Sequence, residues 1–410
     1  MAKVTAEARL PVRPVKAILA TTDVHSSLGD PLPMLSHLHK ARPNTLVADC
    51  GDFFEGSGYY RLGGGALERR LLTRLYDVLA PGNHGWHHHL EPDLRPLTVC
   101  ANVTDDAGAP LFRPLHWAEI GGQLVAVTAV LGEQAFACLP ARDRAGLHFI
   151  EPARALHALA EAHRADAWIV LSHAGYQHDL ALAQESPHLD VIFAGHCHSD
   201  HYGPTVVGAT QVVKGYELAA GYATATPQGS GWHATVHRFA PANHVPLPLP
   251  LQALVQEIDH IRRRLQEPLA VLAPRFRNRP LDLPRLLSEV AAYLRHRACA
   301  EAVVLNQTSL RTLYLREYLT VGTLLGIEPF ANQLTTVNLP DQFVDRPQEL
   351  VAGLARWMGP IITAPDPLPA RLRQVVTTQY VAMSFLDTAN PPDGEPLADI
   401  VRHVLRTSRP

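Results

Sequence analysis

The sequence lacks the features of disulfide-stabilised, membrane-spanning or nucleic-acid-binding proteins. Its 410 residues include five cysteines, an odd number without C-x-x-C spacing, which argues against a disulfide framework and a thiolate zinc site. No stretch approaches the roughly 18 apolar residues of a membrane-spanning helix. Charged residues make up 18% of the chain and the formal net charge is −3. Because this charge balance does not call for nucleic acid or an anionic membrane, we expect a small-molecule partner.

The N-terminal segment has no apolar stretch of the length that a secretory signal needs. Residues Met1 to Lys16 are polar and basic, and the apolar run that follows covers only Ala17 to Ala20. We therefore expect a cytoplasmic protein. The chain length suggests two domains, joined by a proline-rich linker and a connecting helix. The predicted divisions are an N-terminal tail (1–14), a first domain (15–240), the linker and helix (241–273) and a second domain (274–410).

Short aliphatic runs alternate with helical stretches in the first domain, which predicts an α/β fold of sheet layers flanked by helices. Its strand candidates are Ala17 to Thr21, Thr45 to Ala48, Asp77 to Ala80, Val125 to Val130, Trp168 to Leu171 and Val191 to Ala194. The second half again mixes helix and strand, which predicts a smaller α/β or α+β domain. Its candidates are the helices Leu251 to Leu265 and Pro284 to Arg297, and the strands Ala302 to Leu305 and Val375 to Met383.

Side chains of the types that commonly bind metal ions follow five of the predicted strands. Residues just past the carboxyl ends of strands line the ligand site of an open α/β sheet, so we expect these side chains to converge. In an extended segment, alternate residues such as Asp23 and His25 point the same way and can reach one ion. The full set is Asp23, His25, Asp52, Asn83, His84, His173, His196 and His198.

Carboxylate, amide and imidazole ligands without thiolate suit zinc, manganese or iron. Cys197 lies between two candidate ligands, but in an extended segment its side chain would face away from both, so we expect a small buried apolar residue there. One carboxylate shared by two divalent ions holds them about 3.5 to 4 Å apart, a spacing that suits attack on a phosphoryl centre. The sequence therefore predicts a two-metal phosphoesterase.

The order of these motifs resembles that of the calcineurin-like metallophosphoesterases, and within them the 5′-nucleotidase group. The resemblance implies one ion held by Asp23, His25, Asp52 and His198, and a second held by Asp52, Asn83, His173 and His196, with Asp52 bridging. It also implies that Asn83 and His84 face the substrate. His84 would be catalytic, as a donor to the phosphate or to the leaving oxygen, without binding metal.

One departure from the family follows His84. In the nucleotidases, the asparagine-histidine pair is usually followed by glutamate, an aromatic residue and an aspartate that orients the catalytic histidine. Here Trp86 keeps the aromatic residue, but His87 stands where the aspartate is expected. An imidazole stabilises a neighbouring imidazolium poorly. Either Glu91 or Asp93 takes the place of the aspartate, or His84 works with less help.

The resemblance continues into the second half, where the nucleotidases bind the substrate. It implies that Arg311 contacts a charged group, Phe330 stacks on a base and Asn332 hydrogen-bonds to it, and that Asp393 also contributes to binding. The loop that contains Asp393 lacks the second stacking aromatic at its matched position, although Phe385 lies nearby. The expected substrate is a nucleoside 5′-monophosphate or a nucleotide-like metabolite.

Two other functions remain open. The same two-metal site could hydrolyse a different ester, as in the related proteins that cleave thiosulfate esters, although those relatives are exported and no signal peptide is recognised here. Alternatively, the chain could be a binding module that keeps the ions and has lost turnover, for which the missing aspartate is the sole support. Assays of phosphomonoesters with added Mn²⁺ or Zn²⁺ distinguish these functions.

Overall fold

The computed structural model describes residues 13–241, 247–386, 388, 391–392 and 394–407. It divides into two compact units, Met1–Asp259 and His260–Pro410, and the division falls within helix α8 (Leu249–Leu265). Both units mix helices with β-sheets, which confirms the predicted fold class. The domain limits given by the sequence stay a prediction. Within the described residues, the structure contains no helix with the length and apolar character needed to cross a membrane.

The first unit contains two main sheets, of five and six strands. The five-stranded sheet has the order β13-β12-β1-β2-β3, formed by Gly231–Arg238, Gly221–Gln228, Ala17–Thr21, Thr45–Asp49 and Val78–Leu79. The six-stranded sheet has the order β10-β11-β9-β8-β6-β5, formed by Thr205–Val207, Thr210–Lys214, Val191–Ala194, Ala167–His173, Gln123–Leu131 and His116–Ile120. A small antiparallel pair is formed by β4 (Val103–Asp105) and β7 (Leu147–Phe149).

Parallel strands occupy the middle of both sheets. Strands β1, β2 and β3 pair in parallel, as do β6, β8, β9 and β11. Such strands are buried on both faces and therefore read as continuous aliphatic runs, which is why the sequence predicts all of them except β11. A buried cluster that includes Ile18, Ala48, Val127, Ile169 and Phe193 draws on both sheets and holds them face to face. The carboxyl ends of β1, β2, β3, β8 and β9 carry the candidate ligands.

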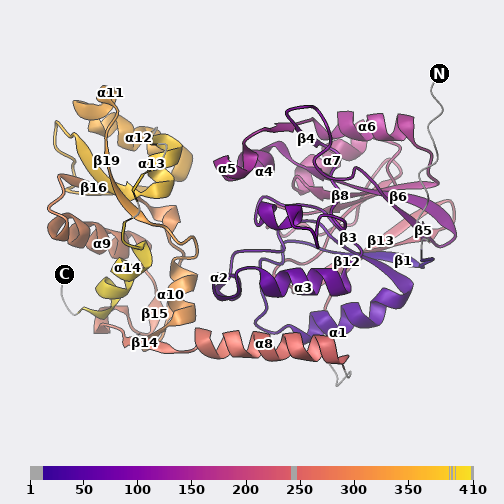
Figure 1. Ribbon diagram of the computed structural model, residues 1–410, viewed down its shortest axis with the longest axis horizontal. Helices are drawn as coiled ribbons and strands as arrows, with labels where there is room; N and C mark the ends of the chain where they lie inside the picture. The colour runs from indigo at the N-terminus through magenta and orange to yellow at the C-terminus, as the bar shows by residue number, and fades with distance from the viewer. Residues whose placement is uncertain (1–12, 242–246, 387, 389–390, 393, 408–410) are drawn as a thin grey trace. The chain divides into compact units, whose positions relative to one another are not determined.

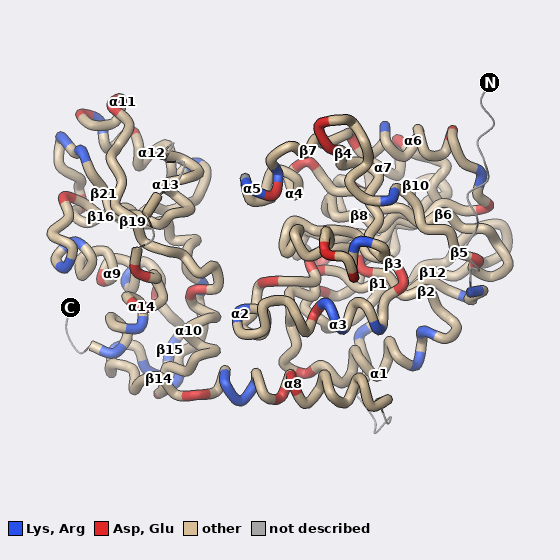
Figure 2. The backbone as a smooth tube through the Cα atoms, in the orientation of Figure 1, with Lys and Arg blue, Asp and Glu red and all other residues tan. Residues whose placement is uncertain are grey.

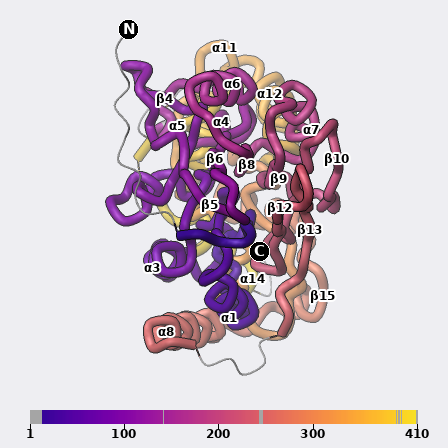
Figure 3. The backbone as a smooth tube through the Cα atoms, turned by 90° about the vertical axis from the view of Figure 1, so that its right-hand side faces the viewer, coloured from indigo at the N-terminus to yellow at the C-terminus, as the bar shows by residue number. Residues whose placement is uncertain are grey.

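Helices cover the outer faces of the two sheets (Figures 1 and 3). One layer contains α1 (Leu32–Ala41) and α3 (Ala66–Leu75), which contact each other, and the opposite layer contains α6 (Pro152–Ala162) and α7 (Tyr176–Glu185). Apolar side chains of α6 and α7 pack on the six-stranded sheet, where Leu156 and Leu182 meet Val170. The short helices are α2 (Gly58–Gly63), α4 (Glu133–Ala137), α5 (Ala141–Arg144) and the 3₁₀ segments Arg42–Asn44 and Trp86–Leu90.

The second unit is built on one four-stranded sheet with helices on both faces. The sheet has the order β19-β21-β16-β20, formed by Leu334–Asn338, Gln374–Thr378, Ala302–Asn306 and Ile361–Ala364. Helices α9 (Leu283–Arg297) and α14 (Leu397–Arg406) pack on one face, and α12 (Pro347–Met358) and α13 (Gln379–Phe385) pack on the other. The remaining elements are β14 (Pro268–Val271), β15 (Arg279–Pro280), β17 (Tyr314–Leu315), β18 (Tyr318–Thr320), α10 (Val321–Ile327), α11 (Asp341–Val344) and the 3₁₀ segments Pro274–Phe276 and Gln307–Ser309.

The predicted strand Val375 to Met383 is wrong in its second half. The strand β21 ends at Thr378, and helix α13 begins at the next residue. The hydroxyl of Thr378 accepts a hydrogen bond from the backbone N–H of Val381, which caps the helix. A threonine suits both a strand and a helix N-cap, so the β-branched run concealed the boundary.

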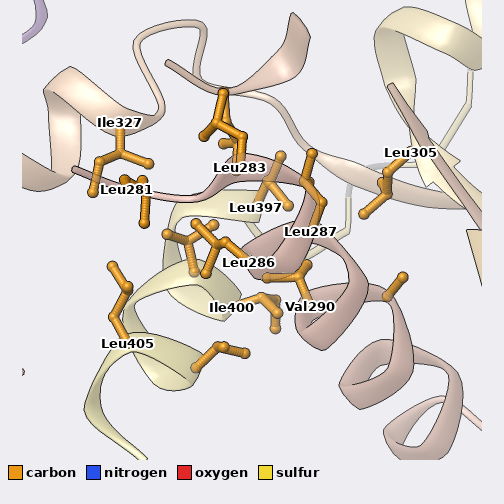
Figure 4. Close-up of a cluster of buried hydrophobic side chains, with 14 of the residues drawn as sticks. Leu281, Leu283, Leu286, Leu287, Val290, Leu305, Ile327, Leu397, Ile400 and Leu405 are labelled. Carbon is orange, nitrogen blue, oxygen red and sulfur yellow. The ribbon is translucent and has the colours of Figure 1, made fainter. Parts of the chain in front are cut away.

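Charged residues of both signs are interspersed along both units, with no long run of one sign in the described chain (Figure 2). The interior of the second unit is aliphatic. Figure 4 shows side chains of α9 and α14 interlocked, among them Leu286, Leu287, Val290 and Ile400, which are all fully buried.

Leu287 provides a test of this packing. Because its side chain is fully buried between helix and sheet, Leu287→Ala should lower the free energy of unfolding by about 2–5 kcal/mol through lost burial and the cavity left behind. The control is Val271→Ala, since Val271 is 50% exposed and its truncation should change stability little. Urea denaturation of the full chain measures both. Equal losses in the two variants would contradict this description of the core.

Candidate metal centre

The loops that follow five parallel strands bring the predicted ligands together. Asp23 and His25 follow β1, Asp52 follows β2, Asn83 and His84 follow β3, His173 is the last residue of β8, and His196 and His198 follow β9. Three of these strands belong to one sheet and two to the other. The site therefore lies where the carboxyl edges of both sheets meet.

The geometry of the first loop differs from the extended segment that the sequence predicts. Asp23 and His25 both have φ of 48°, in the left-handed region. Their backbone N–H groups donate to the carbonyls of Gly51 and Asp52, at 3.0 and 2.9 Å. The loops after β1 and β2 thus hold each other, and the two side chains reach the same site through a turn. His196 has φ of 73°, so the loop after β9 is also turned rather than extended.

Two glycines make room for the ligands. Gly51 has φ of +98°, and a Cβ added there would lie 2.7 Å from Nδ1 of His173. A Cβ on Gly82 would overlap the carboxylate of Asp52. A side chain at either position would displace a candidate ligand, so these positions require glycine.

Three candidate ligands form the first group around Asp23. The Nε2 atoms of His25 and His198 are 3.2 Å apart, and Oδ1 of Asp23 lies 4.0 Å from the first and 3.6 Å from the second. Oδ2 of Asp52 lies 3.8 Å from Nε2 of His25. Asp23 is fully buried, whereas the side chain of His198 is 49% exposed, so the group opens outward at His198.

A second group lies on the other side of Asp52. Nε2 of His173 is 3.3 Å from Oδ2 of Asp52 and 3.3 Å from Oδ1 of Asn83. The ligand atoms of Asp52, His173 and His196 all lie within 4.8 Å of one another. The same Asp52 oxygen therefore faces both groups. The structure brings together all seven residues of the expected ligand set; that they bind metal stays a prediction.

These separations fit metal coordination. Bonds of about 2.0–2.2 Å place neighbouring ligand atoms of a tetrahedral ion about 3.3–3.6 Å apart, close to the distances around Asp23 and Asp52. Oxygen and imidazole donors are those that zinc, manganese and iron accept. Two carboxylates balance only half the charge of two divalent ions, so the loaded site would remain cationic. A cationic site suits an anionic phosphoryl group.

The pKa values of the candidate ligands also fit metal binding. Burial alone would raise the pKa of Asp52, but the nearby imidazole of His173 holds it well below its usual value. Burial lowers the pKa of His196 to about 4, so its imidazole is neutral at neutral pH, which is the form that binds metal. Burial also opposes the charge on His173, yet Asp52 raises the pKa of His173 to about 9. A divalent ion bound there would replace that proton.

A buried lysine holds the loop that carries His196 and His198. The fully buried ammonium of Lys214 donates to the carbonyls of Cys197 and Ser199, at 2.8 and 2.6 Å, and is paired with Glu217. The Cys197 thiol faces α7, where its Sγ accepts the N–H of Tyr176 at 3.1 Å. Cys197 is partly buried against the apolar cluster beneath α7. Sequence reasoning missed Lys214, because a lysine at the end of a strand usually lies in solvent.

His84 is paired with a carboxylate that the sequence analysis did not consider. Nδ1 of His84 lies 2.9 Å from Oε2 of Glu55, in the loop after β2. The expected replacements, Glu91 and Asp93, instead face Arg69, at 3.9 and 2.8 Å, so that expectation is wrong. The side chain of His84 is 37% exposed, and one of its ring nitrogens lies within 4.8 Å of ligand atoms of His25 and Asp52.

The predicted substrate-binding residues of the second unit are partly brought together. The guanidinium of Arg311 lies over the Phe330 ring, 4.9 Å from its centroid, and Phe330 is 47% exposed. Nδ2 of Asn332 donates one hydrogen bond to the buried carboxylate of Glu328 at 2.9 Å. Phe385 is partly buried against the core. Asp393 lies outside the described residues.

Comparison with known proteins supports the sequence resemblance. Residues 16–200 match the family model described as calcineurin-like phosphoesterase. An apyrase from Tabanus yao is 27% identical over 192 residues, which cover 43% of this chain and 34% of the apyrase. Other curated relatives are named 5′-nucleotidases, including those of Homo sapiens and Rattus norvegicus. The chain spans about a third of the length of most of these relatives.

Solved structures show the same fold over both units. A 5′-nucleotidase precursor from Thermus thermophilus superposes with a TM-score of 0.68 and 19% identity, over 95% of this chain and 96% of that one. The sulfate thiohydrolase SoxB of Thermus thermophilus gives a TM-score of 0.69 and 18% identity, over 97% and 95%. Residues 16–200 therefore form a calcineurin-like phosphoesterase domain. Its relatives and structural neighbours include 5′-nucleotidases, which confirms the resemblance read from the sequence.

Asp52 tests the two-metal arrangement. Because the same carboxylate oxygen faces both groups of ligands, Asp52→Ala should reduce the content of both ions, from two per chain toward none. Elemental analysis of the purified variant measures this loss. Asp93→Ala is the control, since Asp93 is paired with Arg69 at the surface, and it should keep both ions. Two ions retained by the Asp52 variant would disprove the shared carboxylate.

Proposed function

We propose that the protein is a metal-dependent phosphomonoesterase that hydrolyses a nucleoside 5′-monophosphate or a nucleotide-like metabolite. The observation that carries the proposal is the convergence of two buried carboxylates, an asparagine and four imidazoles where the carboxyl edges of the two sheets meet, with His84 beside them. The match of residues 16–200 to the calcineurin-like phosphoesterases and the curated 5′-nucleotidase relatives support it. Oxygen and imidazole donors favour manganese, zinc or iron as the divalent ions.

The ligand set explains why such a site would act on phosphate esters. When bound, two divalent ions would neutralise charge on the phosphoryl oxygens and activate a water molecule. The carboxylates of Asp52 and Asp23 lie 3.3 to 4.0 Å from the nearest imidazole nitrogens. Oδ1 of Asp52 also accepts the backbone N–H of His84 at 2.8 Å, which ties the loop after β3 to the ligand set.

His84 is the candidate proton donor. Its side chain is partly exposed, while Nδ1 is engaged by Glu55. Nε2 then serves the substrate, by donating to a phosphoryl oxygen or to the leaving oxygen as its bond to phosphorus breaks. An alkoxide is a poor leaving group, so a proton delivered at that moment lowers the barrier.

The second unit supplies the substrate selectivity in this proposal. Phe330 is exposed, and an exposed aromatic ring offers a face on which a nucleobase can stack. Arg311 lies over the same ring and can pair with an anionic group of the substrate. Roles for Asn332 and Asp393 stay predictions, and one of the two Nδ2 hydrogens of Asn332 is already donated to Glu328.

His84→Ala separates chemistry from metal binding. If His84 assists the transition state without holding an ion, this variant should lower kcat roughly 10²- to 10⁴-fold and keep its metal content. Steady-state kinetics on a nucleoside monophosphate and elemental analysis measure the two quantities. Loss of an ion along with activity would make His84 a ligand. An unchanged kcat would remove it from the chemistry.

Phe330 and Arg311 test the substrate class. Phe330→Ala should weaken kcat/KM for a nucleoside 5′-monophosphate by about 1–3 kcal/mol, the range of base stacking, and leave 4-nitrophenyl phosphate nearly unchanged. Arg311→Ala should also act mainly on the nucleotide. Trp357→Ala is the control, since Trp357 is exposed on α12. Equal losses on both substrates would show that the second unit does not recognise the nucleoside.

The remaining alternatives are distinguished by one substrate panel. Wild-type protein loaded with Mn²⁺ or Zn²⁺ should release phosphate from phosphomonoesters. Turnover of an S-sulfonated thiol and of no phosphoester would instead favour thiosulfate-ester hydrolysis. Tight binding of nucleotides without turnover of any ester would favour a binding module.

A further inference from the structure

The loop after β2 places a carboxylate on both the ring and the backbone of the His84 segment. Oε2 of Glu55 contacts Nδ1 of His84 at 2.9 Å, and Oε1 accepts the backbone N–H of Gly85 at 2.9 Å. A carboxylate that engages two adjacent residues through its two oxygens fixes their relative orientation. Glu55 therefore restrains the rotation of the imidazole against the backbone that carries it.

The backbone at Glu55 is unfavourable for glutamate. Its φ is +65°, in the left-handed region, where a residue with a Cβ is more strained than glycine. The loop is also tightly packed: a Cβ on Gly85 would meet the side chain of Phe54, and one on Gly56 would meet His25. A glutamate held in such a conformation indicates that its side chain, rather than its backbone preference, is what the position requires.

The other nearby candidates are otherwise engaged. His87 occupies the position at which the resemblance leads one to expect an aspartate, and Glu91 and Asp93 face Arg69. Asp52 accepts the backbone N–H of His84 and faces the ligand imidazoles. Among the residues that the structure describes, Glu55 is the carboxylate paired with the His84 ring.

We propose that Glu55 is a positioning residue for His84, supplied from the loop after β2 in place of the carboxylate missing at position 87. By accepting the Nδ1–H bond, Glu55 keeps a proton on Nδ1 and fixes the direction of Nε2. The water oxygen forms a bond to phosphorus, the bond from phosphorus to the leaving oxygen breaks, and the imidazolium form of His84 delivers its Nε2 proton to that oxygen. The proton that the attacking water loses restores the Nε2 proton. The products are an alcohol and inorganic phosphate. This inference rests on the proposed phosphomonoesterase activity.

The dependence on the leaving group tests this role. Glu55→Gln should lower kcat roughly 10- to 100-fold on a nucleoside 5′-monophosphate, the usual effect of losing a residue that orients a catalytic group. The same variant should change kcat on 4-nitrophenyl phosphate much less, because nitrophenolate leaves without a proton. KM and metal content should stay unchanged. Asp93→Asn is the matched control and should behave as wild type on both substrates.

A second variant distinguishes a loss of activity from a loss of stability. Glu55→Gly removes the carboxylate and relieves the left-handed strain, so its melting temperature should equal or exceed that of wild type while the nucleotide kcat falls. Equal loss on both substrates, loss of metal, or an unchanged nucleotide kcat in Glu55→Gln would overturn the positioning role. Wild-type protein that turns over no phosphomonoester would overturn the proposed function itself.

Discussion

Burial of two carboxylates at the junction of two sheets is the constraint on which the rest of the first unit depends. Asp23 and Asp52 are almost completely inaccessible to solvent, and a buried charge without partners is strongly unfavourable. The surrounding imidazoles and the backbone amides of His84 and His196 supply those partners. The strands act as a rigid frame that delivers these groups to one point.

Much of this frame could be predicted from the sequence, because central parallel strands are aliphatic throughout. Strands β1 and β9 begin and end at the predicted residues, Ala17–Thr21 and Val191–Ala194. The antiparallel strands β12 and β13 were not predicted. Their buried positions are filled largely by Ala223, Ala225 and Ala234, and alanine among threonine and glycine gives no clear alternation of apolar and polar residues.

The site could be predicted in its residue types and less well in its contacts. Asp, His and Asn next to glycine at strand ends identify the ligand candidates. The partner of His84 could not be read from the chain, because Glu55 lies 29 residues away and reaches it through a left-handed turn. A signal was present in the run from Asp52 to Gly56, where an acidic residue stands between a ligand and a glycine. The role of Glu55 becomes clear only when the folded chain brings the loop after β2 beside the loop after β3.

The left-handed backbone at Asp23, His25, Asp52 and His196 affects how these positions are expected to vary among homologues. At each position, glycine would adopt the observed conformation with less strain, so the observed side chains are kept at some conformational cost. A homologue that no longer needed the ions would gain stability by replacing these residues. In homologues that have lost the activity, these four positions should therefore be among the first to change to glycine, before the aliphatic residues of the strands change. The residue types at these four positions then indicate whether a given homologue still uses the site.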